Sequence, residues 1–105
     1  MKTKVVYISG PITGVERYWE AFEKAEEELE AAGFIALVPT RLPKGLTNEQ
    51  YMRIDLAMID AADAVLFLPG WKESAGALTE NAYCVYTGKS HFYYIASLTK
   101  WGVQI

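Results

Sequence analysis

The chain has 105 residues, which fits one domain large enough to bury a core without disulfides. Its 13 acidic and 10 basic side chains leave it slightly acidic, which disfavours binding to nucleic acid polymers because such binding needs broad positive charge. One cysteine cannot form an internal disulfide, and no apolar run suggests a signal peptide or a membrane span. We therefore expect a single domain over residues 1–105, in the cytoplasm, with no membrane partner.

Short apolar runs and amphipathic segments alternate in the first half of the chain. The β-branched run 4–9, "KVVYIS", is typical of a strand buried on both faces. A helix is predicted over 15–32, because apolar residues recur every three or four positions and acids occupy the other side. A second strand is predicted at 34–39, and "TNEQ" can cap a second helix at 48–62.

The alternation continues in the second half. Residues 63–70 form the most hydrophobic strand candidate, and a third helix is predicted over about 75–87, ending at Gly88. The run "HFYYIA", residues 91–96, predicts a fourth strand, and the tail after it is a candidate fifth. This order predicts an α/β sandwich with a mainly parallel sheet of four or five strands, whose first three loops meet where ligands bind.

The first of these loops is "SGPITG", residues 9–14. Gly10 and Gly14 let backbone N–H groups approach an anion at the start of a helix. The glycine spacing differs from that of a P-loop and of a dinucleotide fingerprint. A tight turn that needs the conformational freedom of glycine explains the motif equally well.

Asp55 is an unusual acid, because it shares a helix face with Tyr51, Met58 and Ile59. An unpaired buried carboxylate is costly, so Asp55 needs either a partner or a cleft in which its altered pKa is useful. The alternative is an acid at the edge of the apolar stripe that reaches solvent or an arginine.

Glu80 is the second acid of interest. It lies about one and a half turns into the third helix, after a plausible N-cap at Ser74 and a small residue at Gly76. It could tip into the crevice at the strand ends. From spacing alone, an exposed helical acid is the simpler explanation.

Other candidates carry weaker signals. Trp71 could stack on a flat base or cover it, or pack on its own helix, and the Tyr7 hydroxyl could contact a carboxylate or pack in the core. Asp63 is a candidate binding residue, although its place before a strand is also typical of a turn. With only His91 and Cys84 available, no metal cluster is expected.

Together, "YISGPITG", "RIDLAMIDAADAVLFLPGW" and "ESAGALTENAYCVYTGK" resemble the nucleoside 2-deoxyribosyltransferase superfamily. The closest resemblance is to its short branch of uncharacterised, often phage-encoded or bacterial proteins, the domain of unknown function 4406 type. It extends over residues 4–95 and rests on three motifs in the same order. It implies a flavodoxin-like three-layer α/β fold and assembly into homodimers or larger homo-oligomers. We expect no cofactor.

The resemblance also implies roles for individual residues. Glu80 matches the nucleophilic glutamate, Asp55 the aspartate that assists the departing base, and Tyr7 a tyrosine beside the nucleophile. Ser74 and Gly76 match positions that hold a 5′-phosphate in nucleotide-hydrolysing members. From the resemblance and the patterns above together, the candidate substrate-binding residues are Ser9, Gly10, Pro11, Ile12, Gly14, Asp63, Trp71, Ser74 and Gly76.

These roles describe an enzyme that cleaves the N-glycosidic bond, or exchanges the base, of a nucleoside or nucleoside 5′-monophosphate. Glu80 would attack the anomeric carbon while Asp55 protonates or orients the base. Burial beside Glu80 could raise the pKa of Asp55 for this task. The alternatives are a non-catalytic nucleotide-binding module of the same fold and a structural or interaction protein.

Overall fold

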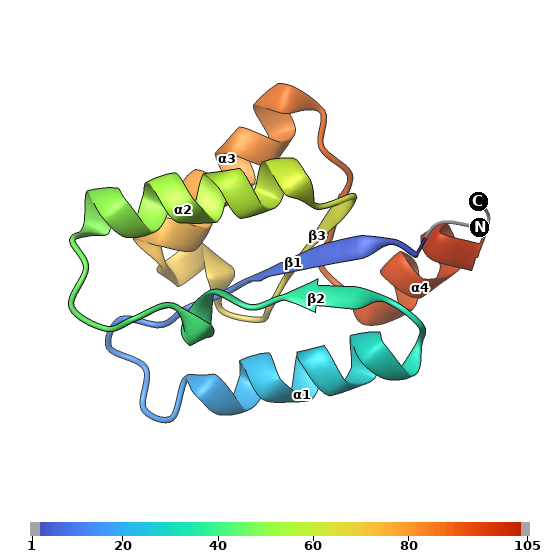
Figure 1. The fold of residues 1–105 in the computed structure, drawn as a ribbon, viewed down its shortest axis with the longest axis horizontal. Helices are drawn as coiled ribbons and strands as arrows, with labels where there is room; N and C mark the ends of the chain where they lie inside the picture. The colour runs from blue at the N-terminus through green and yellow to red at the C-terminus, as the bar shows by residue number, and fades with distance from the viewer. Residues whose placement is uncertain (1–2, 104–105) are drawn as a thin grey trace.

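The computed structural model describes residues 3–103, in which strands alternate with helices (Figure 1). The elements are β1 (Val5–Ser9), α1 (Trp19–Ala31), β2 (Ile35–Leu37), α2 (Asn48–Ala61), β3 (Ala64–Phe67), α3 (Ala75–Thr87), β4 (His91–Phe92) and α4 (Ile95–Val103), with short 3₁₀ turns η1 (Pro39–Arg41) and η2 (Trp71–Glu73). No helix within the described residues is both long enough and apolar enough to cross a membrane.

The strands form one parallel sheet in the order β2-β1-β3-β4. Tyr7 of β1 lies opposite Leu37 of β2 on one side and Val65 of β3 on the other. The chain therefore runs from β1 to one side of the sheet and then crosses to the other side for β3. The strand order reverses between β1 and β3, and ligands of such sheets bind at the carboxyl ends of these strands. The predicted α/β fold is confirmed.

Each face of the sheet is covered by two helices, α1 and α4 on one side and α2 and α3 on the other (Figure 1). The core beneath α1 and α4 contains Val6, Ile8, Phe22, Leu29 and Leu98. The core beneath α2 and α3 contains Tyr7, Ile59, Val65, Phe67 and Cys84. Because successive strand side chains point to opposite faces, the middle of β1 contributes to both cores. A continuous apolar run is the sequence pattern that this double burial requires.

Helix α1 begins later than predicted. Residues 15–18 were expected to be helical, but α1 starts at Trp19. Arg17 has a φ of 54°, in the left-handed region, which interrupts a right-handed helix. The link from β1 to α1 is therefore a longer loop than the sequence pattern indicates.

The C-terminal part of the sheet also differs from the prediction. β4 has only two residues. Tyr93 and Tyr94 form a bend, and α4 replaces the end of the expected fourth strand and, within the described residues, the candidate fifth strand. Ile95, Leu98 and Trp101 recur every three residues and pack on the α1 side of the sheet, which a helix allows and a strand does not. Gly102 lets α4 approach Phe34, because a Cβ there would lie 2.5 Å from the Phe34 ring. Residues 1–2 and 104–105 of the predicted domain and tail lie outside the described residues.

Candidate functional site

Glu80 is buried in the structure, with only 4% of its surface exposed. Ser74 caps α3 by accepting a hydrogen bond from the N–H of Ala77 at 3.2 Å. Ala77, Glu80 and Cys84 then follow at helical spacing and form the buried face of α3. The explanation of Glu80 as an exposed helical acid is therefore wrong.

Two hydroxyl groups on β1 hold the Glu80 carboxylate. The Tyr7 hydroxyl donates to Oε1 at 3.1 Å, and the Ser9 hydroxyl donates to the same oxygen at 2.7 Å. Tyr7 and Ser9 alternate along the strand, so both side chains point to the face covered by α3. Tyr7 thus lies in the core and also contacts the acid, while Oε2 of Glu80 receives neither hydroxyl.

Asp55 lies on α2, half-buried beside this group. It is close enough to Glu80 and Tyr7 for each to affect its pKa. Its buried Oδ1 accepts no hydrogen bond from any described residue. An oxygen left in this state costs free energy unless it receives a donor, and a proton shared with the neighbouring Glu80 carboxyl would supply one.

The two acids are electrostatically coupled. Burial raises the pKa of Glu80 to about 8 and the Asp55 charge adds to the rise, whereas the Ser9 hydrogen bond opposes it. Burial also raises the pKa of Asp55. For the Tyr7 phenol, burial and then the Glu80 charge raise the pKa far above its usual range, so it remains a donor. Near neutral pH the pair therefore retains a proton, which suits one acid to donate it and the other to act as a base or nucleophile.

The loops after β1 and β3 meet beside this pair, as predicted. A Cβ at Gly10 would lie 3.0 Å from Cβ of Leu68, and one at Gly70 would lie 3.3 Å from Cγ of Pro11. These contacts show that Gly10 and Gly70 allow the two loops to pack closely. The tight-turn explanation of the first loop is thus supported by packing, and it does not conflict with a binding role for the backbone.

The other predicted binding residues lie in different parts of the molecule. Ile12 packs against the core beneath α1, on the sheet face opposite Glu80. Gly14 has a φ of 78° and open space around it. Gly76 lies in the first turn of α3, where a Cβ would be 4.0 Å from Met52 of α2. Ser74 and Gly76 therefore stay at the carboxyl ends of the strands, together with Glu80.

Asp63 lies at the other end of the sheet. Its Oδ2 accepts a hydrogen bond from the N–H of Val5 at 2.7 Å, where β1 begins. This position corrects its assignment as a binding residue and agrees with the turn explanation.

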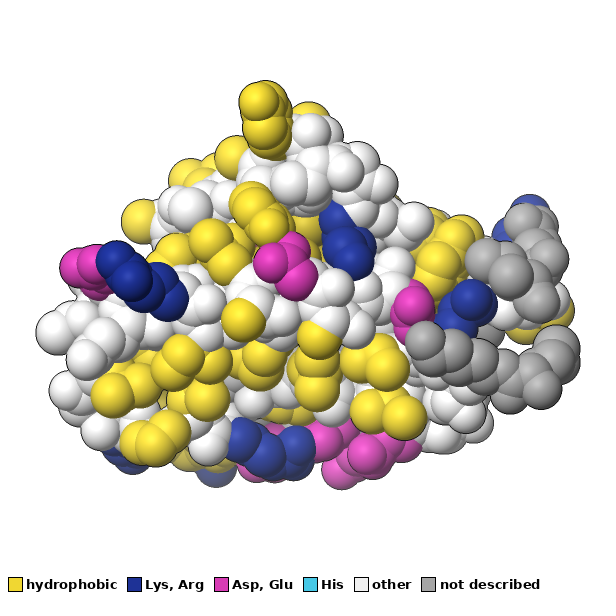
Figure 2. Space-filling model, turned by 45° about the horizontal axis from the view of Figure 1, so that its top comes forward, with side chains coloured by type: hydrophobic (Ala, Val, Ile, Leu, Met, Phe, Trp, Pro, Cys, Tyr) yellow, Lys and Arg dark blue, Asp and Glu magenta, His cyan; other side chains and the backbone are white. Residues whose placement is uncertain are grey.

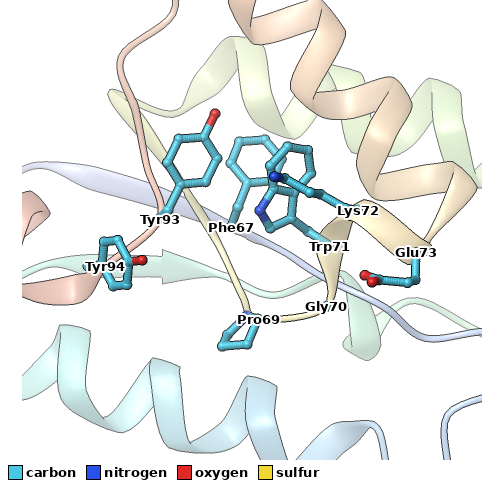
Figure 3. A pocket seen from close by; sticks show the side chains of 8 residues that line it. All are labelled: Phe67, Pro69, Gly70, Trp71, Lys72, Glu73, Tyr93 and Tyr94. Atoms are coloured by element: carbon cyan, nitrogen blue, oxygen red, sulfur yellow. The ribbon is translucent and has the colours of Figure 1, made fainter.

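Trp71 lines a separate pocket of about 330 Å³, which Figure 3 shows together with Phe67 and Tyr93. Neither Glu80 nor Asp55 lines this pocket. The sequence suggested a stacking role for Trp71 but did not indicate Tyr93, which was expected in a strand. It also placed Ser9 among the substrate contacts, although the alternation of Tyr7 and Ser9 along β1 could have indicated a shared partner.

A solved structure of another protein shares the α/β fold of this chain. The structure described as "2-desoxiribosyltransferase from Leishmania mexicana" aligns with a TM-score of 0.67 and 19% sequence identity. The alignment covers 85% of this chain and 62% of that one, so this chain spans less than two thirds of its neighbour. At this identity the likeness shows the fold alone.

The family itself follows from a second comparison. The family model "Domain of unknown function (DUF4406)" matches residues 4–93, so the chain belongs to this family. No curated protein matches the chain.

Proposed function

We propose that the protein cleaves the N-glycosidic bond, or exchanges the base, of a (deoxy)nucleoside or nucleoside 5′-monophosphate. The observation that carries this proposal is the buried Glu80 carboxylate, held by Tyr7 and Ser9 with the Asp55 carboxyl group beside it. The structural neighbour is described as a deoxyribosyltransferase, which agrees with this chemistry.

In the proposed reaction Glu80 is the nucleophile. Its Oε1 accepts both hydroxyl hydrogen bonds, so Oε2 is the oxygen left to attack the anomeric carbon. The bond from that carbon to the base nitrogen breaks, and its electron pair leaves with the base. Water or a second base then attacks the glycosyl ester and releases Glu80.

Asp55 is proposed to supply the proton that the departing base takes up. Burial raises its pKa, although the hydrogen bonds with Glu80 and Tyr7 oppose the rise, so Asp55 takes up a proton more readily than an exposed aspartate would. In the resting site the shared proton lies on Glu80, because burial and the neighbouring Asp55 raise the pKa of Glu80 to about 8. The hydroxyls of Tyr7 and Ser9 stabilise ionised Glu80 and so favour transfer of that proton to Asp55 as the reaction begins. The half-buried Asp55 carboxyl group would then meet the base.

The substrate-binding part of the proposal uses the neighbouring loops. Ser74 and Gly76 begin α3, where backbone N–H groups and the helix dipole favour a phosphate. The backbone of Gly10, Pro11 and Gly14 would contact the sugar or its phosphate. A nucleoside 5′-monophosphate therefore fits the proposal better than a nucleoside.

We also propose that the protein forms a homo-oligomer through α2 and α3. Figure 2 shows hydrophobic side chains on this face, and Leu78, Val85 and Tyr86 of α3 are 45%, 61% and 92% exposed. Light scattering of the parent and of Val85→Glu would test this. If this face joins copies of the chain, the buried charge should weaken the contact and lower the measured mass of the assembly.

A trapped intermediate would test the reaction directly. The protein is incubated with a 2′-fluoro-2′-deoxynucleoside 5′-monophosphate, whose fluorine slows release of the glycosyl group, and its intact mass is measured. We expect an adduct on Glu80 and free base in solution, and neither with Glu80→Gln. Absence of adduct and of base across a panel of nucleotides would contradict the proposal.

A non-catalytic nucleotide-binding module is the second candidate. The burial of Glu80 favours it, because the acid has little direct access to a substrate in this conformation. Saturable nucleotide binding without release of base, equal in the parent and in Glu80→Gln, would identify this function.

A further inference from the structure

The edge of the sheet beyond β3 is only partly covered. β4 pairs with β3 at Val65↔His91 and Leu66↔Phe92 and then ends. A pocket of about 330 Å³ opens next to the end of β3, between η2 and the segment after β4 (Figure 3). The short fourth strand thus creates a hollow that the predicted longer strand would fill.

Three aromatic rings form one wall of this pocket. The Trp71 and Tyr93 rings are nearly parallel, with centroids 5.3 Å apart and an angle of 23°. Phe67, which is 1% exposed, packs against both rings at 5.5 and 5.8 Å. The Tyr93 hydroxyl accepts a hydrogen bond from the Asn81 amide at 3.0 Å. The wall is therefore held by the core and by α3, and its position does not depend on a ligand.

The rim of the pocket is charged. Lys72 and Glu73 lie on η2, and neither forms an ion pair with the described residues. The Lys72 ammonium lies 5.7 Å from the centroid of the Trp71 ring, a contact that is weak at an exposed site. A flat ligand could replace Lys72 on the ring, and the freed ammonium would then meet an anionic group on that ligand.

The pocket is close to the Glu80 site but separate from it. η2 leads directly into Ser74, the N-cap of α3, and Glu80 lies about 9 Å further along the helix at 1.5 Å per residue. None of Tyr7, Asp55 and Glu80 lines the pocket. A ring bound against Trp71 would therefore lie outside the group formed by Tyr7, Asp55 and Glu80.

We propose that this aromatic pocket is a second binding site, for a planar ring that carries a negative charge, as in a nucleoside monophosphate. Trp71 and Tyr93 supply the stacking surface, Lys72 faces the anion, and Glu73 accepts from an amino or N–H edge of the ring. The site does not depend on chemistry at Glu80. Its ligand is either the distal nucleotide of an extended substrate or a second nucleotide molecule.

The fluorescence of Trp71 provides a local measurement. In a Trp19→Phe, Trp101→Phe protein, titration with AMP should quench Trp71 in a saturable way. Adenosine should bind several-fold more weakly, and phosphate alone should cause no quenching. Calorimetry on the parent protein should include a binding event with the same affinity, which would show that the two Phe substitutions did not create the site.

Substitutions of the residues that line the pocket test whether AMP binds there. Tyr93→Leu should weaken AMP by about fivefold or more, because a stacking surface is lost. Tyr93→Phe, which keeps the ring, should bind nearly as the parent does. Lys72→Ala should weaken AMP but not adenosine. Tyr86→Leu, which changes an exposed tyrosine outside the pocket, should leave the affinity unchanged.

A dinucleotide distinguishes the two sources of the ligand. If it binds more tightly than AMP, and Tyr93→Leu removes that advantage, the pocket takes the distal part of an extended substrate. If the dinucleotide and AMP bind with equal affinity, the pocket takes a second, separate nucleotide molecule. The proposal is overturned if Trp71 shows no saturable change or if Tyr93→Leu and Lys72→Ala bind as the parent does. It is also overturned if Tyr93→Leu changes only the mass of the assembly, because the pocket would then be an interface between copies.

Discussion

The two faces of the sheet bury very different chemistry. Beneath α1 and α4 the buried side chains are apolar, with Phe22, Leu29 and Leu98 fully enclosed. Beneath α2 and α3 the sheet buries Ser9 and Glu80 alongside apolar groups. Burying polar groups costs free energy, whereas burying apolar ones stabilises the fold. The comparison indicates that one layer supplies most of the stability and the other holds the reactive groups.

Glu80→Gln, a change in the polar layer, should have the largest effect on the proposed activity. Under the proposed function, loss of the nucleophile should lower base release by about a thousandfold or more. The melting temperature should stay the same or rise, because Gln is neutral without the proton that Glu80 must take up when it is buried at neutral pH. Base release and thermal melting of the same preparations provide the test. A large fall in melting temperature would show that the acid is a structural group.

Leu29→Ala should have the opposite pattern. Removing a fully buried side chain from the core beneath α1 should lower the free energy of unfolding by about 2–5 kcal/mol. The rate of base release per folded molecule should be the same as in the parent. Urea unfolding gives the stability, and Leu78→Ala, at a position 45% exposed on α3, is the matched control with a much smaller loss.

The stability of the protein should depend on pH because of the buried Glu80 in the polar layer. The pKa of Glu80 is raised from an ordinary 4.5 to about 8, so between these values the folded state holds a proton that the unfolded state has lost. Stability should therefore fall as the pH rises from about 5 to 8. Melting curves of the parent should show this slope, and those of Glu80→Gln should be flatter. Equal slopes would argue against a raised pKa at Glu80.

Ser9→Ala should have the smallest effect of these substitutions. It removes the 2.7 Å hydrogen bond that stabilises ionised Glu80, so the pKa of Glu80 should rise further. If Glu80 is the nucleophile, kcat/KM at neutral pH should fall about tenfold, as expected for a hydrogen bond to a charged group. Part of the loss should return at higher pH. Thr79→Ala, whose hydroxyl bonds only within α3, should leave the pH profile unchanged.

Much of the fold could be predicted from local patterns. The apolar runs of β1 and β3 and the helical periodicity of α1 identify the layers, and Thr47 and Gln50 form the predicted cap of α2. The end of the sheet could not be predicted in this way. Tyr93 and Tyr94 favour a strand by propensity, but they form the bend between β4 and α4. The helix that follows packs Leu98 into the core beneath α1, and that contact is distant in sequence.

The site shows the same division. The spacing of Asp55 on its helix indicated that the acid needed an explanation, but spacing alone favoured an exposed Glu80. The face of α3 that meets the sheet is marked only by Ala77 and Cys84, small residues that give a weak periodic signal. The motif resemblance identified Glu80, whereas the shared hydrogen bonds of Tyr7 and Ser9 depend on how α3 lies over β1.

The placement of Tyr7 and Ser9 on β1 has a further consequence. β1 lies between β2 and β3, so its backbone amides are enclosed by neighbours on both sides. Amides in such central strands exchange their hydrogens with solvent mainly when the whole domain opens. The hydroxyls that orient Glu80 are therefore anchored to the slowest-opening part of the molecule. The alignment of this acid should persist for as long as the domain stays folded, whereas the loops around it can move within the native state.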